Sequence, residues 1–109
     1  MLTVLNSDTI DVIGTCLQGY ITATQTDLEK VFGQITYNGS ADGKTTKEWN
    51  LLFTNEEETE IVATIYDWKT GGVNETEIHQ WHIGGYNRET ANYVNQYFNQ
   101  IRQKEIQCQ

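Results

Sequence analysis

The feature that most constrains this chain is a two-residue alternation of apolar and polar side chains in two neighbouring segments. Across residues 46–53, every second position from Trp49 to Phe53 is large and apolar. Residues 61–69 repeat the pattern, with apolar side chains at alternate positions from Ile61 to Ile65. Successive side chains of a strand point to opposite faces, so each segment predicts a strand with one buried face. Because only the short acidic segment 55–60 separates them, we expect an antiparallel hairpin.

Two further segments extend this prediction to a larger sheet. Residues 78–83 predict a third strand, ended by Gly84-Gly85, so that the segment from 46 to 83 forms a three-stranded antiparallel sheet. Nearer the N-terminus, residues 10–22 alternate loosely between apolar and polar types. They predict one or two short strands with a break near Gly14-Thr15.

Two helices are predicted from their end signals and their apolar spacing. Thr26 and Glu29 form a capping box, in which each side chain accepts a hydrogen bond from the other residue's amide. Gly33 can take the left-handed geometry that ends this short helix. Asn87 is a good N-cap for a second helix. The apolar residues that follow it recur at helical spacing, at Ala91, Val94, Phe98 and Ile101.

Together these elements predict a single α+β domain over residues 1–109. It is an antiparallel β-sheet with a short helix in the N-terminal half of the chain and a C-terminal helix, both packed on one face. A chain of 109 residues has the usual size of one domain and can bury a core without metal or disulfide support. The last few residues are expected to fray.

Charge and cysteine content narrow the classes of partner. The net charge of −8 repels nucleic-acid phosphates, so direct binding of DNA or RNA through a basic surface is not expected. It favours basic protein partners, or serves solubility alone. Cys16 and Cys108 stand far apart and form neither a zinc motif nor a disulfide framework. Without an apparent leader or a long apolar run, we expect a cytoplasmic protein with free thiols and no membrane contact.

No catalytic or metal-binding arrangement stands out in the sequence. His79 and His82 could activate Cys16, but no local signature surrounds that cysteine. The two histidines are three residues apart, which on a strand places them on opposite faces and prevents them from sharing a metal ion. A weaker hypothesis is a small hydrolase that uses His82 with Asp67. We therefore predict no catalytic residues, no metal and no cofactor.

What remains for function is a group of aromatic and cationic residues around the second and third predicted strands. Aromatic faces stack on nucleobases, and Lys or Arg makes charge-assisted hydrogen bonds to phosphate. Gly84-Gly85, ahead of the helix start at Asn87, would let backbone amides approach an anion. The alternative for Trp49 and Trp81 is that they belong to the core. The predicted ligand-binding residues are Tyr66, Trp68, Lys69, Trp81, His82 and Arg88.

Five segments of the chain resemble a family of small phage-encoded proteins. These segments are LQGYI (17–21), LEKVFG (28–33), KEW (47–49), ATIYDWK (63–69) and WHIGG (81–85). The family is that of phage anti-defence proteins of the Thoeris anti-defence type. The resemblance implies a sponge, which holds a cyclic ADP-ribose-like signal without cleaving it, often between protomers. It does not carry over the binding residues one by one.

The sequence thus leaves two functions open. The first is a non-catalytic phage anti-defence protein that sequesters a cyclic nucleotide immune signal in the host cytoplasm, with Arg88 and Lys69 on its phosphate. The second is an acidic protein-binding inhibitor, or DNA mimic, that blocks a host effector. In a sponge the carboxylates should avoid the pocket, whereas in a mimic they should form a continuous stripe. A homo-oligomer is expected, since a domain of this size has limited room for an enclosed site.

Overall fold

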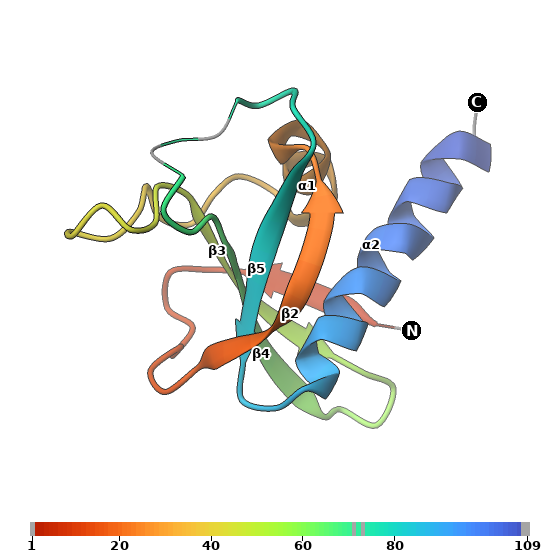
Figure 1. Ribbon diagram of the computed structural model, residues 1–109. Helices are drawn as coiled ribbons and strands as arrows, with labels where there is room; N and C mark the ends of the chain where they lie inside the picture. The colour runs from red at the N-terminus through yellow and green to blue at the C-terminus, as the bar shows by residue number, and fades with distance from the viewer. Residues whose placement is uncertain (1, 71, 73, 108–109) are drawn as a thin grey trace.

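The computed structural model describes residues 2–70, 72 and 74–107. It contains one five-stranded antiparallel sheet in the order β1-β3-β4-β5-β2, together with two helices (Figure 1). The α+β class predicted from the sequence is therefore confirmed. The elements are β1 (Thr3–Asn6), β2 (Cys16–Ala23), α1 (Gln25–Phe32), β3 (Glu48–Thr54), β4 (Glu60–Tyr66), β5 (His79–Gly85) and α2 (Glu89–Gln107).

The three central strands are those that the alternation predicts. β3 and β4 pair antiparallel in an unbroken register from Glu48 opposite Tyr66 to Thr54 opposite Glu60. β4 then pairs with β5, with Tyr66 opposite His82. The edges are β1, which the sequence did not predict, and β2, which pairs along β5 with a bulge after Leu17.

Residues 10–13, predicted as strand, lie in the loop before β2 instead. The carbonyl groups there accept hydrogen bonds from a tyrosine hydroxyl and from an amide of the same loop, rather than from a neighbouring strand. The Tyr86 hydroxyl donates to the Ile13 carbonyl at 2.7 Å, and the Thr15 amide donates to Val12 at 3.2 Å. Ile13 is 84% exposed. Its apolar side chain therefore fits the alternating pattern without belonging to a buried face.

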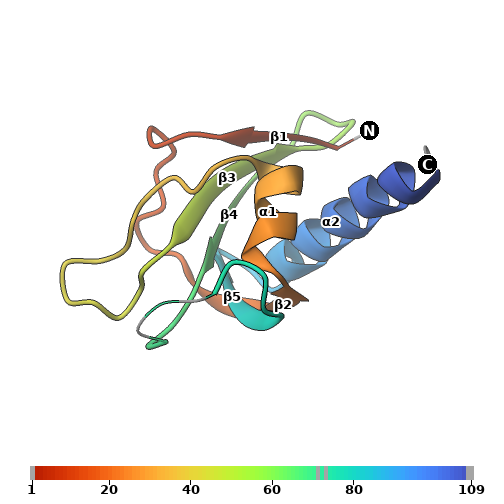
Figure 2. The same cartoon turned by 90° about the horizontal axis from the view of Figure 1, so that it is seen from above.

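Both helices lie on one side of the sheet, and the long loops before β2 and β3 extend on the other (Figure 2). α1 begins two residues earlier than the capping box predicted, because β2 ends at Ala23 and leaves Thr24 to cap the helix. The Thr24 hydroxyl accepts from the Asp27 amide at 3.0 Å, while the Thr26 hydroxyl donates to the Glu75 carbonyl at 3.1 Å. Gly33, at φ 90°, ends the helix as predicted.

α2 starts where Asn87 predicts, since the Asn87 side chain accepts from the Glu89 amide at 3.0 Å. The helix continues through Gln107, beyond the point where fraying was expected, and residues 108–109 lie outside the described part. An ion pair of 3.3 Å between Arg102 and Asp27 joins the two helices.

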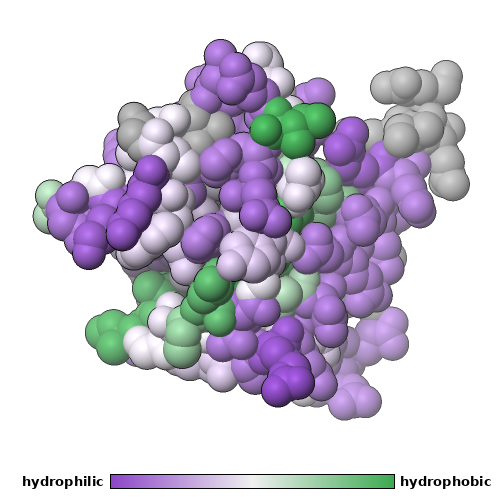
Figure 3. All heavy atoms as spheres, in the orientation of Figure 1, coloured by the Kyte–Doolittle hydropathy of each residue, from purple (hydrophilic) through white to green (hydrophobic). Residues whose placement is uncertain are grey.

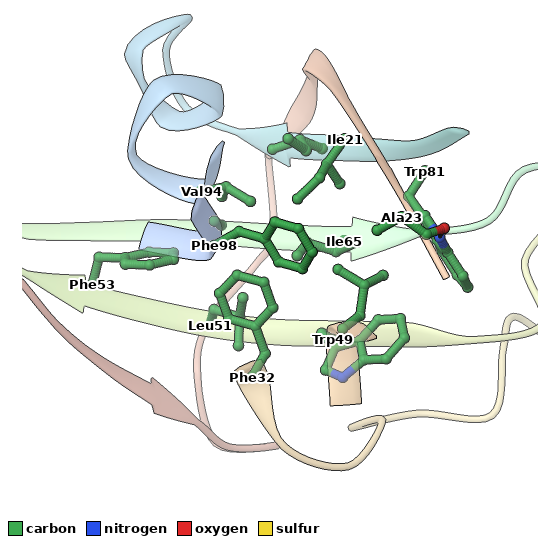
Figure 4. Packing of buried hydrophobic residues seen from close by; sticks show 13 residues of the cluster. Ile21, Ala23, Phe32, Trp49, Leu51, Phe53, Ile65, Trp81, Val94 and Phe98 are labelled. Atoms are coloured by element: carbon green, nitrogen blue, oxygen red, sulfur yellow. Dashed lines mark hydrogen bonds between the residues drawn. The ribbon is translucent and has the colours of Figure 1, made fainter. Parts of the chain in front are cut away.

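The core lies between the helices and the facing side of the sheet (Figure 4). Trp49 and Trp81 are fully buried there, in edge-to-face contact with ring centroids 5.3 Å apart. Their indole N–H groups donate to the carbonyls of Gly33 and Ala23, at 2.9 and 3.1 Å. Buried polar groups with such partners cost little, so both tryptophans can fill the interior.

Gly84 and Gly85 do not end β5, as the sequence suggested, but form its last two paired positions. A methyl group on Gly85 would collide with Thr90 of α2 on the core face, and one on Gly84 would collide with the Thr64 hydroxyl on the other face. The glycines are therefore needed for close packing on both sides of the strand. Both glycines thus belong to the sheet rather than to the turn ahead of α2, where the sequence placed their amides close to an anion.

Candidate ligand-binding cleft on the open face of the sheet

The functional candidates lie on the face of the sheet away from α1 and α2, here called the open face. Strand alternation assigns them to it, because Trp81 and Ile65 are buried on the helix side while their neighbours His82 and Tyr66 are half-buried on the other. The pairing register aligns Tyr66 with both Glu48 and His82, and His82 with Tyr20. One row of side chains thus crosses four strands.

A cleft of about 340 Å³ opens on this face. Its walls are the loops that contain residues 12–16 and 40–45, and its floor includes Thr64 and Gly84. Gly84 has no side chain, which leaves room for the Thr64 hydroxyl directly above it. Glu48, Tyr66 and Trp68 complete the lining. This open-face cleft combines aromatic walls with charged side chains of both signs.

Four rings form an aromatic cluster at one side of the cleft, and His82 lies at its centre. The His82 ring centroid is 5.1 Å from that of Tyr20, 5.4 Å from that of Tyr66 and 6.3 Å from that of Trp68. The planes of Trp68 and His82 differ by only 25°, so these two rings stack. Burial and the nearby His79 lower the pKa of His82, which favours the neutral ring.

Two lysines lie over the Trp68 ring. The ammonium nitrogen of Lys44 is 5.9 Å from the ring centroid and that of Lys69 is 5.6 Å away. Both distances fall within cation–π range, which holds the positive charges at the rim of the cleft. The Lys69 amide also donates to the Lys44 carbonyl at 2.6 Å, so the two backbone segments are fixed to each other.

Asp67 holds this lysine-bearing rim in place. Its side chain is fully buried and accepts from the amides of Thr46 and Lys47, at 2.6 and 3.0 Å, and from the hydroxyls of Thr46 and Thr70. Burial alone would raise the pKa of Asp67, but these hydrogen bonds outweigh it, and the pKa lies below its usual value. The carboxylate therefore braces the segments on either side of Trp68.

Glu48 is a carboxylate of the cleft lining whose charge the described residues do not stabilise by hydrogen bonds. It is half-buried, and no described residue donates a hydrogen bond to its side chain. Burial raises the pKa of Glu48. Burial also raises the pKa of Tyr66, and the negative charge of Glu48 adds to that effect. By contrast, the second carboxylate of the cleft, Asp42, accepts from the Ser40 hydroxyl at 2.5 Å.

The structure brings together four of the six residues predicted to bind a ligand. Tyr66, Trp68, Lys69 and His82 lie in or beside the open-face cleft. Trp81 does not, because it is fully buried on the opposite face, as the core alternative had it.

Arg88 also lies apart from this group. It follows Gly85, which pairs with Ala63, whereas Lys69 follows Tyr66 at the other end of the β4–β5 pair (Figure 1). Arg88 and Lys69 therefore cannot share one phosphate in the way the sequence suggested.

Sequence reasoning missed three residues of the site. Tyr20 and Glu48 could have been found by extending the strand alternation to the face that does not bear the core tryptophans. Lys44 comes from the loop 38–47, whose path depends on Asp67 at a distance of more than 20 positions along the chain. No local pattern indicates that contact.

The described residues do not support the hydrolase, cysteine-nucleophile or metal-site hypotheses. Asp67 directly follows β4, whereas His82 lies in the middle of β5. Both Asp67 oxygens already accept hydrogen bonds from residues 46, 47 and 70, which leaves the carboxylate with a structural role. Cys16 lines the cleft, while His79 contacts Trp81 on the other face. Within residues 2–70, 72 and 74–107, no group of three or more side chains is placed to hold a metal ion.

A larger hollow of about 690 Å³ lies between α2 and the β3–β4 turn, but its chemistry is different. Its lining includes the carboxylates of Glu56 and Glu57 and the amides of Gln96 and Gln100, with one aromatic side chain, that of Tyr93. Figure 3 agrees with this polar character, since the visible surface along α2 is mostly hydrophilic. We therefore regard the open-face cleft as the better candidate, although it is smaller.

Comparison with known proteins identifies no relative, because no protein family, curated protein or solved structure matches this chain. The resemblance to anti-defence sponges therefore rests on the five sequence segments alone. Among the described residues, no helix has the length and apolar character required to cross a membrane.

Proposed function

We propose that this protein binds a cyclic nucleotide-type immune signal in the open-face cleft and sequesters it unchanged in the cytoplasm of a phage-infected host. The observation that carries the proposal is the pairing of exposed aromatic faces with lysines in one cleft. Trp68 is 41% exposed, and the ammonium groups of Lys44 and Lys69 lie within 6 Å of its ring centroid. The resemblance to phage anti-defence sponges supplies the biological role.

The physical fit of a nucleotide follows from these groups. Stacking on an aromatic side chain stabilises a bound base by about 1–3 kcal/mol. A lysine ammonium that moves from the Trp68 ring to a phosphate exchanges a cation–π contact for a stronger charge-assisted hydrogen bond. A cleft of about 340 Å³ is at the small end of ligand sites, which suits one nucleotide unit.

A sponge was expected to keep its carboxylates away from the pocket, but two carboxylates lie in this cleft. Asp42 and Glu48 both line it, although Asp42 also lies 3.9 Å from the Lys44 ammonium. The alternative function, an acidic inhibitor of a basic host effector, draws support from a different place. Exposed glutamates gather at the β3–β4 turn, at positions 56, 57, 58 and 60. They form a local cluster rather than the continuous stripe of a DNA mimic.

One experiment separates these functions. The protein is incubated with a panel of cyclic nucleotides, freed of unbound ligand and heat-denatured, and the supernatant is analysed by mass spectrometry. Recovery of an intact nucleotide supports sequestration. A chemically changed nucleotide would reveal an enzyme, and no uptake of any nucleotide would favour the protein-binding alternative.

Variants make the same experiment specific to the cleft. Lys69→Ala and Lys44→Ala should each reduce nucleotide affinity about ten- to a hundredfold, as expected for a lost charge-assisted contact worth about 1.5–3 kcal/mol. Arg88→Ala is the matched control, because it removes an exposed cation at the far end of the β4–β5 pair. If Arg88→Ala weakens binding as much as the lysine variants, the ligand does not lie in the open-face cleft.

The proposal includes a homo-oligomer. Several large apolar side chains on or beside the open face are exposed, among them Leu5, Leu17 and Tyr20, at 54%, 45% and 46%. In the view of Figure 3, apolar atoms gather at the lower left, near the loop that precedes β2. A second copy that covers this side would close the cleft and bury these groups. A sedimentation mass of 12.5 kDa at micromolar concentration would contradict the oligomer.

A further inference from the structure

Glu48 differs from the other carboxylates that surround the open-face cleft. Asp67 is fully buried, but four hydrogen bonds stabilise its charge. Asp42 is bonded to Ser40 and to the Lys44 amide. Glu48 is half-buried in the same cleft, and no donor from the described residues reaches its side chain. The Glu48 oxygens are not among the fully buried polar atoms without a partner, so water can reach them in the free protein. A ligand that fills the cleft displaces this water and must offer hydrogen-bond donors in its place.

The surroundings of Glu48 restrict what that donor can be. Tyr66 lies directly opposite Glu48 in the β3–β4 register, and both residues line the cleft. A base held beside these rings can hydrogen-bond to the Glu48 carboxylate only through its edge, because the donors and acceptors of a base lie at its edge. The edge that suits a carboxylate carries two adjacent N–H donors, since an ionised carboxylate only accepts hydrogen bonds.

Among the nucleobases, guanine offers such an edge, with N1–H beside the N2 amino group. Adenine offers one donor beside an acceptor, and a carboxylate repels the acceptor. We propose that Glu48 is the specificity-determining residue of the cleft and selects a guanine base over adenine. This inference rests on the function proposed above and adds the class of base that the same site takes. It departs from the adenine-containing, cyclic ADP-ribose-like signal that the sequence resemblance implies.

A substitution that replaces one oxygen of Glu48 should change the preference between guanine and adenine. Glu48→Gln replaces one carboxylate oxygen with an amide NH₂, which gives a donor and an acceptor side by side. This pattern matches adenine and leaves the guanine edge half unpaired. A correct bidentate pair discriminates between bases by about tenfold or more. Wild type should bind guanine nucleotides at least tenfold more tightly than adenine nucleotides, and Glu48→Gln should lose or reverse this preference.

The test is isothermal titration of wild type, Glu48→Gln and Glu77→Gln with cyclic GMP and with cyclic AMP. Glu77→Gln is the matched control, because Glu77 is exposed and lies outside the cleft lining. It should retain the wild-type preference. Thermal unfolding of all three proteins checks that they are folded, and Glu48→Gln should be at least as stable as wild type, since it removes a carboxylate without a donor.

The outcomes separate this inference from the proposed function. A guanine preference in wild type and Glu77→Gln that disappears in Glu48→Gln supports the role of Glu48. Equal affinity of wild type for both nucleotides, or a preference that survives in Glu48→Gln, overturns the inference but leaves nucleotide binding intact. Failure of wild type to bind either nucleotide at millimolar concentration overturns the proposed function, and the inference with it.

Discussion

The two faces of the sheet use the same kinds of side chain for opposite purposes. On the helix side, Trp49 and Trp81 are fully buried and in contact, and both indole N–H groups are satisfied by backbone carbonyls. On the open face, Tyr66 and His82 are only half-buried, and Trp68 is 41% exposed. Trp81 and His82 are neighbours in the chain, and a single step along β5 separates a core residue from a candidate ligand contact.

Strand position, rather than residue type, decides the role of an aromatic side chain in this protein. The core face has two helices to cover it, whereas the open face has only the ends of two loops. Aromatic rings on the first face therefore contribute mainly to stability, and those on the second remain accessible to a ligand. Substitutions on each face should therefore differ in their effect on the free energy of unfolding.

The largest effect is expected from truncation on the core face. Trp81→Ala should destabilise the protein by about 3–5 kcal/mol, because it leaves a large cavity and frees the Ala23 carbonyl. Trp68→Ala should cost about 1 kcal/mol or less, since its ring is partly exposed. Chemical denaturation of both variants measures the difference. Similar losses for the two would mean that the open-face cluster is a second core rather than a site.

A smaller but substantial effect is expected at Asp67. Asp67→Asn should cost about 2–3 kcal/mol, because the amide cannot accept all four hydrogen bonds that the carboxylate receives. The pKa of the folded carboxylate is lowered, so its contribution is complete above the unfolded pKa and is lost as the pH falls through the folded value.

The stability gap between wild type and Asp67→Asn should therefore narrow on acidification below about pH 4, the usual range for an aspartate. Urea denaturation across a pH series measures this gap. A gap that stays constant into acid would show that the Asp67 charge does not brace the rim of the cleft.

The smallest of these effects is expected at Gly84, in the floor of the cleft. Gly84→Ala should cost about 1–2 kcal/mol, because the new methyl group meets the Thr64 hydroxyl. The double variant Gly84→Ala with Thr64→Ala should recover most of that loss, since it removes the opposing atom. Thermal unfolding of the single and double variants is the measurement. If the double variant shows no recovery, the two residues do not pack as described.

The sequence predicted the part of the fold that depends on local alternation. The strands β3, β4 and β5 and both helices follow from apolar spacing and from end signals such as Gly33 and Asn87. β1 has only four residues and pairs at an edge, so its pattern is too short to detect. Residues 10–13 show the opposite failure, because they alternate like a strand but lie in a loop. There the Tyr86 hydroxyl donates to the carbonyls of Asp11 and Ile13.

The site was predicted less completely, for a physical reason. Tyr66, Trp68, Lys69 and His82 lie close together along two paired strands, so their association follows from the hairpin. Trp81 was included because residue type alone does not distinguish the two faces. Lys44 was missed because Asp67, at the end of β4, holds its loop through the amides of residues 46 and 47. Such a long-range hydrogen-bond network leaves no trace in the local sequence.

The most direct test of the account uses the difference between the tryptophans themselves. Trp68 is the exposed one of the three, while Trp49 and Trp81 are buried on the other face. Fluorescence of wild type and of Trp68→Phe is followed during titration with cyclic GMP. A ligand in the open-face cleft should quench wild type saturably and leave the remaining emission of Trp68→Phe unchanged. An equal quench in both proteins, or none in wild type, would contradict binding at the open face.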